Sequence, residues 1–110
     1  MNDTFITQYS QKMNTVISGV PVTVYKEGIV KINNEVVVPL YDVDNYSKVC
    51  IGGHYYKLQN IIASVFLEYD LAEKNRFITH IDKNPRNNHV ENLQIEHMGS
   101  KRKLENLSLD

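Results

Sequence analysis

One histidine, His80, lies at the start of a segment rich in side-chain amides. Four asparagines follow it, at Asn84, Asn87, Asn88 and Asn92. A neutral imidazole takes a proton from water near neutral pH, and an amide bonded to its second ring nitrogen fixes the tautomer. The segment therefore predicts a general base in a hydrolytic site. Because Asn is also common in turns and caps, a purely structural role for the four amides is the alternative.

The order of residues from His80 to Leu93 resembles a nuclease motif. The string His-Ile-Asp-x-Asn-x-x-Asn-Asn-x-x-x-Asn-Leu is similar to the core of the HNH family of phage and mobile-element endonucleases. In that family a ββα unit binds a divalent metal (Mg, Mn or Zn) and the scissile phosphate. The resemblance implies that His80 is the general base and that Asn92 orients it or fixes the loop.

A second segment also resembles this family. The apolar positions within residues Gln59 to Phe66 are similar to those of a helix of the form His-Arg-Leu-Val-Ala-x-x-Phe in HNH proteins of the homing type. Here Gln59-Asn60 replaces the His-Arg pair, which lies near the site and the phosphates in the family. The replacement lowers the expectation of ordinary nuclease activity. The resemblance covers roughly residues 36–104.

The metal positions implied by the resemblance carry unsuitable residue types. The residue before the base is usually Asp, Asn or His, and this sequence has Thr79. The second ligand, nine residues after Asn92, would be Lys101. A neutral hydroxyl is a poor ligand for hard divalent ions, and an ammonium group repels them. The metal site is therefore expected to be impaired, with Asp82 and His97 as candidate substitutes.

The charge of the chain limits how strongly it can bind nucleic acid. Twelve basic residues stand against 13 acidic residues, which gives a net charge of -1. Five cations nevertheless fall in or after the asparagine-rich segment. With two of the amides they form the candidate nucleic-acid-binding set: Lys83, Arg86, Asn87, Asn88, Lys101, Arg102 and Lys103. We expect weak DNA binding that decreases steeply with salt.

The pattern of apolar residues predicts an α+β fold. We expect a helix in residues 1–18, a β meander, a hairpin with a Gly52-Gly53 turn, a core helix, and a C-terminal ββα unit. The predicted strands are Val20–Tyr25, Ile29–Ile32, Val36–Leu40, Lys48–Ile51, His54–Leu58, Phe77–Ile81 and Leu93–Ile95. The core helix runs from Leu58 to Phe66, and a terminal helix begins near Ser100.

Length and composition indicate one domain. A chain of 110 residues with 42% hydrophobic residues supplies one core. We divide it into residues 1–45, the helix and meander, and residues 46–110, the HNH-like portion. No apolar stretch reaches the length of a membrane span, and the lone Cys50, expected to be buried in a strand, favours a cytoplasmic setting.

Two function classes remain open. The first is an HNH-type enzyme that nicks DNA with a divalent metal. The second is an inactive HNH-fold binding module, for example a phage inhibitor of a host defence nuclease, which acts through protein or DNA contacts. Free strand edges also permit self-association into an oligomer.

Overall fold

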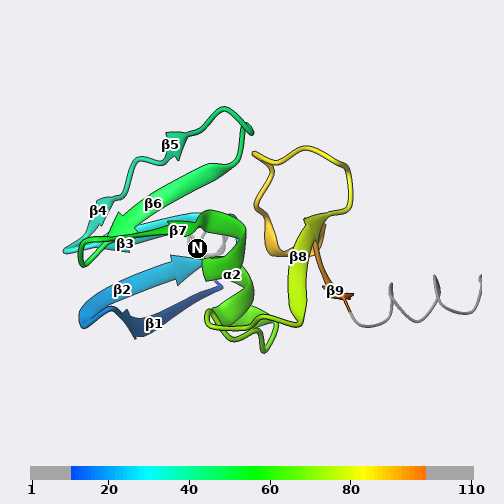
Figure 1. Cartoon of the computed structure of the whole chain (residues 1–110). Helices are drawn as coiled ribbons and strands as arrows, with labels where there is room; N and C mark the ends of the chain where they lie inside the picture. The colour runs from blue at the N-terminus through cyan, green and yellow to red at the C-terminus, as the bar shows by residue number, and fades with distance from the viewer. Residues whose placement is uncertain (1–10, 99–110) are drawn as a thin grey trace, which may run out of the picture.

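Antiparallel sheets and one α-helix make up the part of the chain that the computed structural model describes, residues 11–98 (Figure 1). The strands are β1 (Lys12–Ile17), β2 (Val20–Tyr25), β3 (Ile29–Ile32), β4 (Glu35–Val36), β5 (Leu40–Tyr41), β6 (Ser47–Ile51), β7 (His54–Lys57), β8 (Arg76–His80) and β9 (Leu93–His97). The helices are α2 (Leu58–Phe66) and the 3-10 helix η2 (Val90–Asn92). The arrangement is α+β, as predicted.

The first sheet contains β1 to β4 in sequence order, each paired antiparallel with the next. The predicted strands β2 and β3 are confirmed with their expected bounds. Asn33 and Asn34 join β3 to β4 with φ angles of 53° and 68°, a left-handed conformation that Asn tolerates better than most residues. The meander therefore follows the turn signals of the sequence.

The predicted helix in residues 1–18 is wrong from Lys12 to Ile17, which form strand β1. Ile17 pairs with Val20 across a tight turn at Ser18-Gly19, where both residues have positive φ. A two-residue turn that contains Gly and lies between β-branched runs is typical of a hairpin, and this pairing excludes the helix. Residues 1–10 lie outside the described part of the chain.

The second sheet contains β5, β6 and β7. One strand predicted in this region is wrong. The run Val36–Leu40 does not form one strand: it divides between β4 and β5, which belong to different sheets. Pro39 lies at the division and cannot donate to a sheet ladder, which explains the break. The β6–β7 hairpin is confirmed, and its Gly52-Gly53 turn has φ angles of 60° and 84°.

Helix α2 lies between the sheets and the β8–β9 ribbon (Figure 1) and contacts β2, β6, β7, β8 and η2. Its predicted apolar stripe is confirmed, because Ile61 and Ile62 are completely buried. The same core cluster contains Val24 from the first sheet, Val49 from the second and Ile78 from the ribbon. One core therefore connects all three sheets. The division at residue 45 stays a prediction.

Cys50 is exposed, so the prediction that it is buried is wrong. On β6 the pleat directs Val49 and Ile51 into the core and Cys50 outward, opposite Tyr55. Within residues 11–98, no helix combines the length and the apolar character needed to cross a membrane. The predicted helix near Ser100 falls outside the described residues.

Candidate active site

The β8–β9 ribbon and the loop between its strands carry the candidate site. The strands pair in a register that places Thr79 opposite Gln94 and His80 opposite Leu93. His80 is the last residue of β8, and η2 leads directly into β9. The loop therefore starts and ends at one end of the ribbon, beside His80.

His80 is buried and makes a hydrogen bond to one amide of the loop. Its side chain is 8% exposed, and its Nε2 lies 2.7 Å from Oδ1 of Asn88, a residue that is 4% exposed. A carboxamide oxygen only accepts hydrogen bonds, so Nε2 is the donor in this contact. The ring of Tyr46 lies beside the imidazole, with centroids 5.8 Å apart. The contact with Asn88 and the neighbouring Tyr46 ring hold the imidazole in one orientation.

Asn92 fixes the loop instead of contacting His80. Its Nδ2 donates to Oδ1 of Asp82 at 2.9 Å and to the carbonyl oxygen of Asn87 at 2.8 Å. Its Oδ1 accepts the backbone N–H of Asp82 at 3.1 Å. Of the two roles that the resemblance implied for Asn92, this geometry matches loop fixation. The amide that orients the imidazole is that of Asn88.

Asp82 is the centre of the loop's hydrogen-bond network. Besides Asn92, its carboxylate accepts the Nδ2 group of Asn87 and the backbone N–H of Asn84, each at 2.8 Å. These bonds, led by the one from Asn87, lower the pKa of the Asp82 carboxyl below its usual 3.8. The carboxylate therefore holds the loop together, and its role as a substitute metal ligand stays a prediction.

The first sheet supports the other end of the loop. The backbone N–H of Val90 donates to the carbonyl oxygen of Lys26 at 2.8 Å. A Cβ atom at Gly28, which has a φ of +96°, would lie 3.0 Å from the carbonyl carbon and oxygen of Asn88. The turn between β2 and β3 therefore packs directly against the residue that holds His80.

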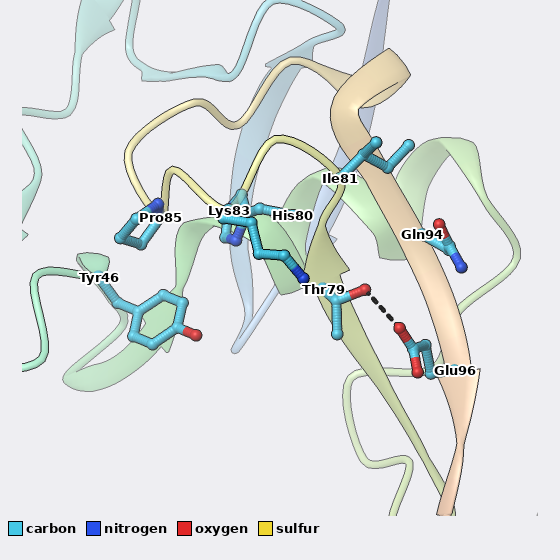
Figure 2. Close-up of a pocket in the computed structure, with 8 residues that line it drawn as sticks. All are labelled: Tyr46, Thr79, His80, Ile81, Lys83, Pro85, Gln94 and Glu96. Carbon is cyan, nitrogen blue, oxygen red and sulfur yellow. Dashed lines mark hydrogen bonds between the residues drawn. The ribbon is translucent and has the colours of Figure 1, made fainter.

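An open pocket of about 550 Å³ lies next to the imidazole. It is lined by Tyr46, Thr79, His80, Ile81, Lys83, Pro85, Gln94 and Glu96 (Figure 2). The hydroxyl of Thr79 donates to Oε2 of Glu96 at 3.0 Å across the ribbon. The pocket thus combines one imidazole, one carboxylate and one ammonium group, the last from Lys83.

The side chains that the structure describes in this pocket do not by themselves form a complete site for a divalent metal. Nowhere in residues 11–98 do three His, Cys, Asp or Glu side chains gather closely enough to hold a metal ion. His97 lies opposite Arg76 in the ribbon register, at the far end from His80. Thr79 offers a neutral hydroxyl that Glu96 already engages. The pocket therefore supplies one anionic donor, Glu96, and a cation that opposes metal binding.

The predicted nucleic-acid-binding residues lie in different environments. Lys83 and Arg86 are exposed in the loop, and the Arg86 guanidinium stacks 3.9 Å from the ring centroid of Tyr41. Asn87 and Asn88 use their side chains to hold Asp82 and His80. The three remaining cations, Lys101, Arg102 and Lys103, lie outside the described residues.

Sequence reasoning did not find Tyr46, Gly28 or Glu96 as members of the site. Glu96 joins Thr79 because residues two apart on β9 share a face of the ribbon. Predicting the contact between Thr79 and Glu96 requires the β8–β9 strand register, and the length of the connecting loop does not determine that register. Tyr46 and Gly28 come from distant segments of the chain, and no local pattern marks them.

The chain is similar in structure to an HNH nuclease. No protein-family model matches the chain, and no curated protein matches it in sequence. Among solved structures, the HNH homing endonuclease I-HmuI, from a study of its DNA binding and cleavage, matches with a TM-score of 0.64 and 22% identity. The match covers 86% of this chain and 56% of that chain, so this chain spans little more than half of I-HmuI. At this identity the similarity shows an HNH-like fold.

Proposed function

We propose that this chain is an HNH-like DNA-binding protein, related to metal-dependent nicking endonucleases and with an impaired metal site. The observation that supports the proposal most is the contact between Nε2 of His80 and Oδ1 of Asn88, 2.7 Å long and buried. Because this contact occupies Nε2, we assign the role of proton acceptor to Nδ1 of an imidazole that lines an open pocket. A general base in hydrolysis needs an unprotonated nitrogen with access to solvent.

His80 would accept a proton from a water molecule as the water oxygen attacks the phosphorus atom of a phosphodiester. The bond from phosphorus to the leaving sugar oxygen would break, and that oxygen would take a proton from solvent. Asn88 holds the ring during this step, and Asn92 with Asp82 keeps the loop in place. General base catalysis contributes about 10²–10⁴-fold to a rate. Stabilisation of the developing phosphorane charge is usually the larger contribution. Among residues 11–98, the pocket lacks a complete set of ligands for the divalent metal that HNH nucleases use for this purpose. Nicking is therefore expected to be slow.

A plasmid-nicking assay tests the enzymatic part of the proposal. Supercoiled DNA is incubated with the wild-type chain and with Mg²⁺, Mn²⁺ or Zn²⁺, and the same assay is run on His80→Ala. His54→Ala is the matched control, because His54 is an exposed residue of β7 away from the pocket. We expect slow nicking by the wild type and the control, and none by His80→Ala. Circular dichroism checks that each variant folds.

The second candidate function is an inactive HNH-fold binding module. The hydrogen bond between Thr79 and Glu96 favours it, because the residue at the metal position is engaged in holding the ribbon together. Such a module would bind DNA or a protein target, such as a nuclease effector of a host defence system. Folded wild-type protein that binds DNA and nicks none of it with any of the three metals would establish this second function against the first.

A further inference from the structure

Lys83 is held beside His80 by the geometry of the loop. Its backbone has a φ of +66°, and its N–H donates to the carbonyl oxygen of His80 at 3.0 Å. A tight turn of this kind returns the chain to the end of β8, where the Lys83 side chain lines the pocket. Because Asp82 and Asn92 fix the same turn, the position of Lys83 is set by the loop network.

The ammonium group of Lys83 extends into the pocket and has no fixed partner among residues 11–98. In Figure 2 the side chain runs over the pocket, and its terminal nitrogen points toward Thr79. Among the described residues, the Lys83 ammonium has no ion pair, and no hydrogen bond from it is observed. The nearby carboxylate, Glu96, is turned to the hydroxyl of Thr79. A cation with free donors is therefore available to an incoming anion.

We infer that Lys83 replaces a divalent ion as the cation of this pocket, so that the site binds a DNA phosphodiester without any metal. The inference rests on the proposed function, because it takes DNA as the ligand of the His80 pocket. A Lys ammonium binds phosphate as a compact point charge with three donors. It supplies charge at the place where the other pocket residues do not form a metal site.

Glu96 allows an experiment that distinguishes a phosphate site formed by Lys83 from a metal site formed by Glu96. If the pocket binds phosphate through Lys83, the Glu96 carboxylate repels the same phosphate, and its neutralisation strengthens DNA binding. If the pocket instead binds DNA through a metal held by Glu96, the same change weakens metal-dependent binding. Glu96→Gln therefore gives opposite results for the two kinds of site.

The experiment measures fluorescence anisotropy of a labelled short DNA duplex, in excess EDTA and in Mg²⁺ at matched ionic strength. The variants are Lys83→Gln, Lys83→Arg, Glu96→Gln and the control Lys74→Gln. Lys74 is an exposed cation in the loop before β8, and it does not line the pocket, so its variant makes the same charge change elsewhere.

We expect the wild type to bind at least as tightly in EDTA as in Mg²⁺. Lys83→Gln should weaken binding about three- to tenfold and reduce the salt slope by about 1, as for the loss of one phosphate contact. Lys83→Arg should keep most of the affinity, and Glu96→Gln should bind more tightly than the wild type in EDTA.

Four results would overturn the inference. Wild-type binding that needs Mg²⁺, or equal losses in Lys83→Gln and Lys74→Gln, would reject Lys83 as the cation and leave the proposed DNA-binding function intact. Weaker binding by Glu96→Gln in Mg²⁺, with no gain in EDTA, would indicate a metal held by Glu96. A folded wild type that binds no duplex under either condition would reject the inference together with the proposed function.

Discussion

Gly28 packs against the backbone of Asn88, the residue whose carboxamide oxygen accepts the Nε2 proton of His80. A Cβ atom at position 28 would lie 3.0 Å from the carbonyl carbon and oxygen of Asn88. That distance is shorter than normal van der Waals contact, so a side chain at position 28 would require Asn88 to move. The β2–β3 turn of the first sheet therefore helps to position the candidate base on the ribbon.

Gly28→Ala is expected to displace Asn88 and loosen His80. Gly53→Ala is the matched control, because Gly53 also has a positive φ, of +84°, and no atom lies within 4 Å of its added Cβ. Both variants carry the backbone strain of alanine at positive φ, and only Gly28→Ala adds overpacking, which costs about 1–3 kcal/mol. Urea unfolding measures the difference. Equal destabilisation of the two variants would show that the contact with Asn88 relaxes freely.

Asn88→Ala is expected to release the imidazole of His80 from its single tautomer. The Nε2–H group would remain buried without an acceptor, which costs about 1–3 kcal/mol of unfolding free energy. Asn84→Ala is the control, because Oδ1 of Asn84 accepts the backbone N–H of Arg86 and does not contact His80. Nitrogen NMR of the histidine ring reports the tautomer. A single Nε2-protonated form in Asn88→Ala would contradict the assigned role.

The sequence predicted the parts of the fold whose signals are local. The helix Leu58–Phe66 has a strong apolar stripe, and the Gly52-Gly53 turn specifies its hairpin. The segment Lys12–Ile17 differs from its predicted helix because helical spacing and β-branched composition coexist there, and pairing with β2 decides between them. Local pattern alone does not contain that pairing.

The candidate site was predictable in its residue types and only partly in its contacts. The motif identified His80 and the asparagines, but it did not reveal that Asn88, and not Asn92, contacts the imidazole. Which amide reaches the ring depends on the path of a loop that the first sheet also supports, through Lys26 and Val90. Such contacts between distant segments follow from the assembled fold.

Acid is expected to loosen the loop through Asp82. Hydrogen bonds from Asn87, Asn84 and Asn92 lower its pKa in the folded chain below the usual 3.8. The folded state therefore favours the carboxylate, and the stabilisation is present above pH 3.8 and is lost as pH decreases through the lowered folded pKa. Hydrogen exchange of the Asn84 amide measures this opening. In Asp82→Asn the exchange should lose this acid dependence, and an unchanged acid dependence would assign the opening to another group.

Cys50 is expected to react with a maleimide reagent in the folded protein, because its side chain faces solvent on β6. Cys50→Ser should change the unfolding free energy by less than about 0.5 kcal/mol, as is usual at exposed positions. Ile51, the next residue, is 1% exposed, and Ile51→Ala should cost about 2–5 kcal/mol because it leaves a core cavity. The two adjacent variants test the pleat of β6 directly. Protection of the thiol until denaturation would restore the sequence-based prediction of a buried cysteine.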